Sequence, residues 1–216
     1  FKDIDYVILN HTEPDHSGSL KYLLRENPNI KVVTSMAGNK YMQGIVNGAF
    51  ESHIVKDGDT IDLGGGKVLK FIIAPFLHWP DSMFTYIEQD STLFPCDFLG
   101  CHYCEPRMFN NKIIYKNNFE SAFRYYYDVI FGPFKEHVLK GIEKIQDLKI
   151  EVICPSHGPI LVENIQQYID LYKQWSADIF DKNRPKKILI TYVSAYGCTR
   201  RMAEELEKGV KSAGDF

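Results

Sequence analysis

The stretch His11-Thr12-Glu13-Pro14-Asp15-His16 decides how this sequence is interpreted, because it places four potential metal ligands within six residues. The whole chain has only seven histidines, so this density is high. An apolar run at residues 6–9 precedes the stretch and predicts a buried strand, and a helical pattern follows at 19–25. The alternative is an acidic, solvated loop in which Asp15 or Ser17 caps the helix.

The spacing of these ligands predicts two neighbouring metal ions. A loop that leaves a strand can direct alternate side chains, here His11 and Glu13, at one ion. Asp15 and His16 fall on the turn into the helix, where they can face a second ion close by. Gly18 allows the chain to turn tightly at this point.

Three more residues of ligand type follow predicted strands. His78, Asp97 and His157 each come within four residues of the end of an apolar run. Open α/β sheets place their sites beyond the carboxyl ends of strands. Each residue alone is a weak signal, but together with the first stretch they predict one metal site at one edge of a sheet.

Short apolar runs alternate with helical patterns along the chain. The predicted strands are residues 6–9, 31–34, 54–55, 68–74, 83–87, 92–94 and 152–154. The predicted helices are residues 19–25, 39–47, 120–130, 135–148 and 163–180. Interleaved strands and helices predict an α/β fold, in which the apolar face of each helix covers a sheet.

The composition limits the class of protein. Of the 216 residues, 44% are hydrophobic and 25% are charged, which excludes disordered, collagen-like and coiled-coil chains. No apolar run reaches the roughly 18–20 residues that a membrane span needs. The 25 basic and 28 acidic residues give a net charge of −3 without a long block of like charge. This balance argues against a nucleic-acid partner, which requires a basic face.

The five cysteines favour a reduced, cytoplasmic compartment, because an odd number in a chain of this length does not suggest a disulfide framework. The spacing Cys96-x4-Cys101-x2-Cys104 matches the start of a plant-type iron–sulfur loop, for which Cys154 is the candidate fourth ligand. Free thiols are the interpretation that we favour.

The pattern of ligands resembles that of a known family. His11-x-Glu13-x-Asp15-His16, followed by His78, Asp97 and His157, resembles the metallo-β-lactamase-like domain of flavodiiron proteins, or A-type flavoproteins. The resemblance implies an αββα sandwich over residues 1–180, with the N-terminal part of that domain missing. It also implies the truncated start of a flavodoxin-like, FMN-binding domain at residues 188–216.

The resemblance implies two iron ions held by these seven side chains. One iron is bound by His11, Glu13 and His78, the other by Asp15, His16 and His157, and Asp97 bridges them. Carboxylate ligands suit iron. Hydrolytic relatives of the fold use His-x-His-x-Asp-His with zinc, so the glutamate in place of the second histidine favours redox chemistry over hydrolysis.

The C-terminal segment has features of its own. Residues 181–187 are charged and contain a proline, which is typical of a linker. Residues 188–193 predict a buried parallel strand, and 200–211 predict a helix. The loop between them resembles the phosphate loop of flavodoxins, and its backbone N–H groups and hydroxyls can bind the FMN phosphate. Its residues are Ser194, Ala195, Tyr196, Gly197, Cys198 and Thr199, where Cys198 replaces the commoner Asn or Ser.

Other side chains are assigned less directly. The resemblance suggests that His102 and Tyr127 hydrogen-bond a metal ligand or a bound intermediate, as catalytic residues. Trp79 is expected to pack near the flavin; simple packing is the alternative for Trp79 and for Tyr127. His53 and His137 match nothing in the family pattern and are interpreted as surface or structural residues.

The resemblance implies an oxidoreductase that reduces dioxygen to water, nitric oxide to nitrous oxide, or both. A head-to-tail homodimer, or a dimer of dimers, would bring the flavin of one subunit to the irons of the other. A rubredoxin-like or other small protein would donate the electrons. The alternatives are a binuclear zinc hydrolase and an electron carrier in which the lactamase-like domain is only structural.

Overall fold

The computed structural model describes residues 1–180 and 187–214, which fall into two units. The first unit is Phe1–Ala177 and the second is Asp178–Phe216. Residues 181–186 of the predicted linker lie outside the described residues. The division of the chain predicted at residues 180 and 188 stays a prediction.

The first unit is built on two sheets. One sheet has three parallel strands in the order β1 (Tyr6–Ile8), β2 (Lys31–Ser35) and β3 (Glu51–Val55). The other sheet has the order β4 (Thr60–Asp62), β5 (Val68–Ile73), β6 (Met83–Ile87), β7 (Thr92–Phe94) and β8 (Val152–Ile153). Strands β4 to β7 pair antiparallel, and β8 pairs parallel to β7.

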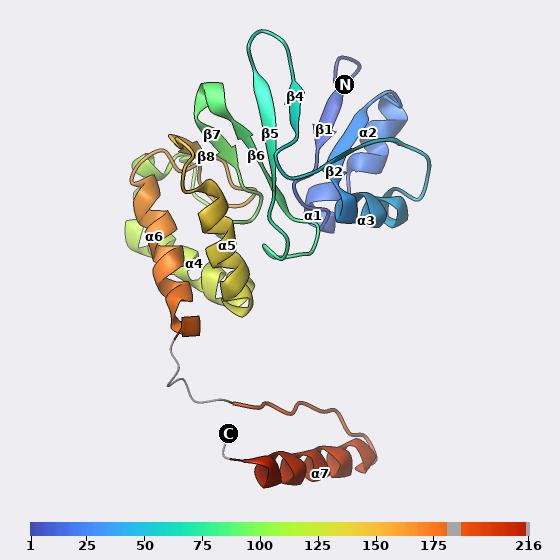
Figure 1. The fold of residues 1–216 in the computed structure, drawn as a ribbon, viewed down its shortest axis with the longest axis vertical. Helices are drawn as coiled ribbons and strands as arrows, with labels where there is room; N and C mark the ends of the chain where they lie inside the picture. Colours follow the sequence, from blue (N-terminus) through green and yellow to red (C-terminus); the bar gives the residue numbers. More distant parts are fainter. Residues whose placement is uncertain (181–186, 215–216) are drawn as a thin grey trace. The chain divides into compact units, whose positions relative to one another are not determined.

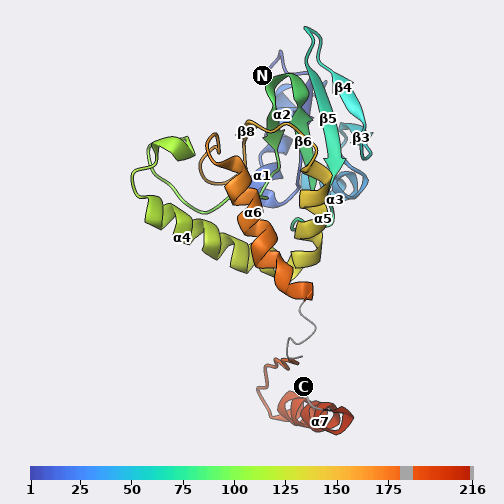
Figure 2. The same ribbon diagram turned by 60° about the vertical axis from the view of Figure 1, so that its left-hand side comes forward.

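The helices divide between the two sheets (Figures 1 and 2). Three accompany the first sheet: α1 (Pro14–Ser17), α2 (Leu20–Glu26) and α3 (Met36–Val46). Three accompany the second sheet: α4 (Lys116–Tyr126), α5 (Lys135–Ile145) and α6 (Ile165–Ser176). A π-helical turn at Tyr127–Phe131 extends α4. No helix within residues 1–180 and 187–214 has the length and hydropathy that crossing a membrane requires.

Three apolar clusters show that the layers are stacked as helix, sheet, sheet and helix. Val32 packs with residues of α2 and α3, whereas its neighbour Val33 packs between the sheets against Phe71 and Met83. Neighbouring side chains of a strand point to opposite faces, so β2 contributes to both clusters. Phe84 belongs to the third cluster, which joins the second sheet to α4, α5 and α6. This αββα sandwich confirms the predicted fold class.

Helix α3 begins earlier than the sequence predicts. The expected start was residue 39, but the Ser35 hydroxyl accepts a hydrogen bond from the Gly38 amide at 3.1 Å and caps a helix that begins at Met36. The cap also fixes this helix beside the metal-site loops, because the same hydroxyl donates to the Asp81 carbonyl oxygen at 2.8 Å.

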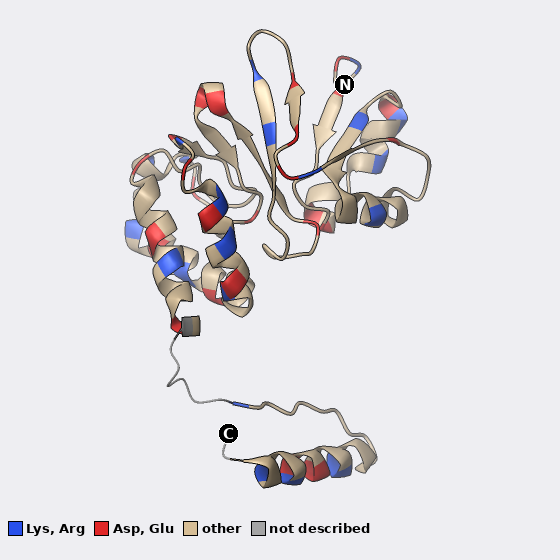
Figure 3. Cartoon of the chain, viewed as in Figure 1, with Lys and Arg blue, Asp and Glu red and all other residues tan. Residues whose placement is uncertain are grey.

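In the second unit, the strand predicted at residues 188–193 is absent; residues 187–193 have no regular secondary structure. A parallel strand needs hydrogen-bonded neighbours, and residues 187–214 contain no second strand to pair with. Leu189 and Val193 are accordingly 86% and 92% exposed. Helix α7 (Cys198–Ala213) carries charges of both signs along its length (Figure 3).

Candidate metal centre

Four loops bring the predicted ligands together at one edge of the sandwich. The first loop follows β1, and the others follow β5, β7 and β8. Strands β5, β7 and β8 point the same way, because β6 is antiparallel to both β5 and β7 and β8 is parallel to β7. Their carboxyl ends therefore meet at one edge, as the sequence predicts.

The first group of ligands converges on the carboxylate of Glu13. Its Oε2 lies 3.3 Å from Nε2 of His11 and 3.3 Å from Nε2 of His78. The same two nitrogens face Oδ2 of Asp97, at 3.8 and 3.3 Å respectively. Two imidazole nitrogens and two carboxylate oxygens thus surround one point.

The second group repeats this arrangement around Asp15. Its carboxylate lies 3.5 Å from Nε2 of His16 and 3.1 Å from Nε2 of His157. Both nitrogens also face Oδ1 of Asp97, at 3.2 and 3.4 Å. His16 therefore points at the site.

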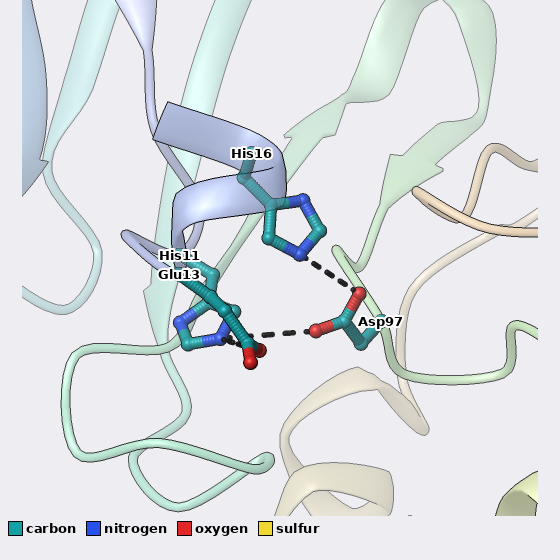
Figure 4. A group of neighbouring side chains, drawn as sticks. All are labelled: His11, Glu13, His16 and Asp97. Atoms are coloured by element: carbon teal, nitrogen blue, oxygen red, sulfur yellow. Dashed lines mark hydrogen bonds and ion pairs between the residues drawn. The ribbon is translucent and has the colours of Figure 1, made fainter. Parts of the chain in front are cut away.

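Asp97 stands between the two groups and gives one oxygen to each (Figure 4). The residue is 1% exposed. Burial favours its neutral form, but the contacts with His16, His78 and His11 outweigh burial and hold the pKa of Asp97 well below its usual range. An ionised carboxylate in this position can bridge two cations.

Two polar atoms at this point have no hydrogen-bond partner among the described residues. They are Nε2 of His16 and Oδ1 of Asp97, which are buried and lie 3.2 Å apart as an ion pair. Buried polar groups without partners are costly and uncommon. A metal ion would satisfy both atoms, so the residues present fit a pair of metal ions.

Several carboxylates also act on the protonation of His16. Burial favours the neutral imidazole, but the contact with Asp97 and the charges of Asp15 and Glu13 outweigh burial and raise the pKa of His16. The protonated imidazole of His16 therefore persists to a higher pH than that of a free histidine. A metal ion must displace that proton to bind.

Asp81 is a site residue that the sequence analysis misses. Its Oδ1 lies 3.1 Å from Nδ1 of His11, and its Oδ2 accepts hydrogen bonds from the Thr12 amide at 2.8 Å and the Thr12 hydroxyl at 2.6 Å. Burial favours the neutral form, but the bonds to His11 and Thr12 lower the pKa of Asp81. In the sequence, Asp81 is indicated only by its position, because it is an acidic residue three positions after the predicted ligand His78.

His102 lies beside the second group, and its role as a catalytic residue stays a prediction. Its ring centroid is 5.2 Å from that of His157 and 4.8 Å from that of Tyr126. The prediction for Tyr127 is not supported by this geometry, because its hydroxyl lies 2.7 Å from the Ser176 hydroxyl, within the helical layer. Tyr126 is the tyrosine beside the second group, with its ring centroid 6.4 Å from that of His157.

Trp79 covers the first group of ligands. Its ring lies edge-on to His11 at 5.0 Å between centroids, and to Tyr41 at 6.3 Å. These contacts show the packing role, and the expected contact with flavin stays a prediction. Of the unassigned histidines, His53 is exposed and His137 packs against Phe76, with 4.7 Å between centroids.

The cysteines do not form a metal site in the described structure. The groups of described residues that can hold a metal contain only His, Asp and Glu, and all five cysteines are free. Burial raises the pKa of the Cys101 thiol to about 12 and also raises the pKa of Cys96, so both thiols stay protonated at neutral pH. The iron–sulfur alternative therefore has no support in the structure.

The predicted phosphate loop lies at the start of a long helix. Gly197, with φ of +82°, precedes α7, so Cys198 and Thr199 form its first turn rather than a preceding loop. The Ser194 hydroxyl is buried without a hydrogen-bond partner among the described residues. Free amides of a helix N-terminus and a free hydroxyl fit an anion such as the phosphate of FMN.

Comparison with known proteins agrees with this geometry. The sequence profile described as ODP family beta lactamase matches residues 1–158. The chain belongs to this family. It is also 51% identical to the flavo-diiron protein FprA2 of Clostridium acetobutylicum over 97% of the chain and 52% of that protein.

Solved structures give the same picture. Rubredoxin oxygen:oxidoreductase from the anaerobe Desulfovibrio gigas superposes with a TM-score of 0.77 at 30% identity, covering 99% of this chain and 53% of that one. The flavodiiron protein from Giardia intestinalis gives a TM-score of 0.77 at 31% identity, covering 99% of this chain and 52% of that one. The predicted resemblance to flavodiiron proteins is confirmed, and the chain spans about half the length of these relatives.

Proposed function

We propose that the protein containing this chain is a flavodiiron oxidoreductase that reduces dioxygen, nitric oxide or both at a pair of non-haem irons. The observation that carries the proposal is Asp97, whose two oxygens face two separate sets of histidine and carboxylate ligands. A relative that is 51% identical bears the name flavo-diiron protein. The structural relative from Desulfovibrio gigas is named as an oxygen oxidoreductase that acts with rubredoxin.

The seven side chains provide the ligands for this centre. His11, Glu13 and His78 would hold one iron, Asp15, His16 and His157 the other, and Asp97 both. When bound, the irons would supply electrons to the diatomic substrate and stabilise negative charge on its oxygen. The Asp15 side chain is 49% exposed. The site is therefore open to a small substrate at Asp15.

Three other residues shape the space around the ligands. The buried Tyr126 and the exposed His102 pack beside His157, and His102 is a titratable group from which a proton can reach the site. Trp79 covers His11 and limits access of water to the first group. These roles concern substrate and proton access and do not depend on which diatomic molecule is reduced.

Electron supply would come from FMN bound at the N-terminus of α7. We infer that a rubredoxin-like or other small protein reduces the flavin, and that a head-to-tail dimer brings the flavin of one subunit to the irons of the other. The five free cysteines support a reduced, cytoplasmic location.

A binuclear zinc hydrolase is the competing function, since zinc also accepts His and carboxylate ligands. Glu13 disfavours it, as does the resemblance of residues 194–199 to a flavodoxin phosphate loop, because hydrolysis needs no flavin. The test is turnover by the intact protein. Consumption of dioxygen or nitric oxide with a chemically reduced flavin supports the proposal, whereas hydrolysis of thioesters or phosphodiesters without either consumption contradicts it.

A further inference from the structure

The side chain of Asp81 joins two loops that carry ligands of the same metal ion. Asp81 is 1% exposed and lies on the loop between β5 and β6, which also carries His78. Its carboxylate contacts His11 and Thr12, which lie on the loop after β1. Its carbonyl oxygen accepts the Ser35 hydroxyl at the start of α3. Asp81 is thus held by the loop after β1 on one side and by the start of α3 on the other.

These contacts determine which nitrogen of His11 carries a proton. The carboxylate of Asp81 already accepts two hydrogen bonds from Thr12, which assigns Nδ1 of His11, 3.1 Å from Oδ1, as a further donor to it. A neutral imidazole with its proton on Nδ1 has a free lone pair on Nε2. That nitrogen faces the Glu13 and Asp97 carboxylates at 3.3 and 3.8 Å, where the metal ion would lie.

We propose that Asp81 is a positioning residue that holds His11 in the tautomer able to bind a metal ion through Nε2. The inference rests on the metal centre of the proposed function, but it does not depend on the reaction at that centre. Partners of this kind orient metal-binding histidines in many proteins, and their loss typically lowers metal affinity about 10–100-fold.

The variant Asp81→Asn reverses the direction of this hydrogen bond. The Thr12 amide, 2.8 Å from Oδ2, needs an acceptor, so the new amide oxygen must face Thr12. The NH2 group then faces Nδ1 of His11, which has to become the acceptor. The proton moves to Nε2 and removes the lone pair that would bind the metal.

The matched control is Thr12→Val. This substitution removes the hydroxyl that donates to Oδ2 at 2.6 Å but keeps the Thr12 amide and the carboxylate. It therefore weakens the same buried network without changing what Nδ1 of His11 can donate to. Any general loosening of the loop appears in both variants, whereas a change of tautomer appears only in Asp81→Asn.

The experiment is nitrogen NMR of the intact protein labelled with 15N-histidine and loaded with diamagnetic Zn²⁺, with His11→Gln assigning the resonance. The wild type and Thr12→Val are expected to show a protonated Nδ1 and a metal-bound Nε2 for His11. In Asp81→Asn, His11 is expected to show a protonated Nε2. The chelator concentration that removes one of the two zinc ions is expected to be about 10–100-fold lower than for the wild type.

Each outcome decides the matter. If His11 of the wild type binds the metal through Nδ1, the proposal is overturned. This measurement does not depend on the folding of any variant. An unchanged His11 tautomer in Asp81→Asn, or equal zinc loss in Asp81→Asn and Thr12→Val, also overturns the proposal. If the wild type binds two zinc ions and any of these results is seen, only the role of Asp81 is refuted. If the wild type binds no metal, the metal centre is refuted as well.

Discussion

At the scale of single residues, Asp97 is the side chain on which the whole site depends. Replacing it by alanine removes the one carboxylate that contacts all four histidines of the site. The iron content of purified Asp97→Ala is expected to fall from two per chain to below one, measured by elemental analysis. Asp147→Ala, an exposed carboxylate, is the control and should keep both irons. Two irons in Asp97→Ala would show that the ligand assignment is wrong.

Glu13 is the residue expected to distinguish iron from zinc. The variant Glu13→His recreates the ligand pattern of the hydrolytic relatives, in which an imidazole replaces a carboxylate. Two histidines and one carboxylate are the typical ligand set of non-haem iron, so losing the carboxylate should raise the ratio of zinc to iron bound from an equimolar mixture several-fold. If the ratio of bound zinc to bound iron does not change, Glu13 no longer argues against a hydrolase.

His16 makes iron binding depend on pH. Its raised pKa means that protonated His16 stabilises the metal-free fold at low pH, and this contribution is lost as the pH rises through the raised value. Iron must displace that proton, so iron affinity should fall as the pH is lowered through the same range. Titration of the metal-free protein with Fe²⁺ at several pH values measures this. The control is His53→Gln, an exposed histidine whose loss should leave the pH dependence of iron affinity unchanged. The same pH dependence in His16→Gln and the wild type would contradict the role of His16.

At the scale of elements, the loops after β7 and β8 hold the second group of ligands by close packing. A Cβ added at Gly100 would lie 2.9 Å from the carbonyl oxygen of His157 and 3.0 Å from that of Asp97. Both contacts are with backbone, so Gly100→Ala must move the loops and is expected to cost about 1–3 kcal/mol of unfolding free energy.

Gly44→Ala is the matched control for this prediction. Gly44 lies inside α3 with no heavy atom within 4 Å of an added Cβ, so alanine there should stabilise the protein by about 0.5–1 kcal/mol. Chemical denaturation of the metal-free protein measures both variants. Equal stability of the two alanine variants would show that the packing at Gly100 is not tight.

Much at this scale can be predicted from the sequence. The alternation of apolar runs and the ligands that follow them, such as His78 and Asp97, indicate both the sandwich and the edge that carries the site. Asp81 and Tyr126 are harder to find this way, because their positions depend on the path of a loop and on which face of a helix meets the second group. The prediction of a strand at residues 188–193 is wrong for a similar reason, because strand formation depends on partner strands elsewhere in the chain.

At the scale of the whole molecule, the chain spans about half the length of its flavodiiron relatives. The sandwich supplies a rigid edge on which four loops place two sets of ligands. The second unit supplies a helix N-terminus suited to a phosphate. We propose that these parts serve an iron pair and a flavin in one protein.

The most direct test of this claim is elemental analysis of the intact protein, purified without added metal, together with its visible spectrum. The account predicts two irons per chain and the absorption bands of a bound flavin. Two zinc ions per chain without flavin would contradict it, identify the site as that of a hydrolase, and make Glu13 a variant zinc ligand.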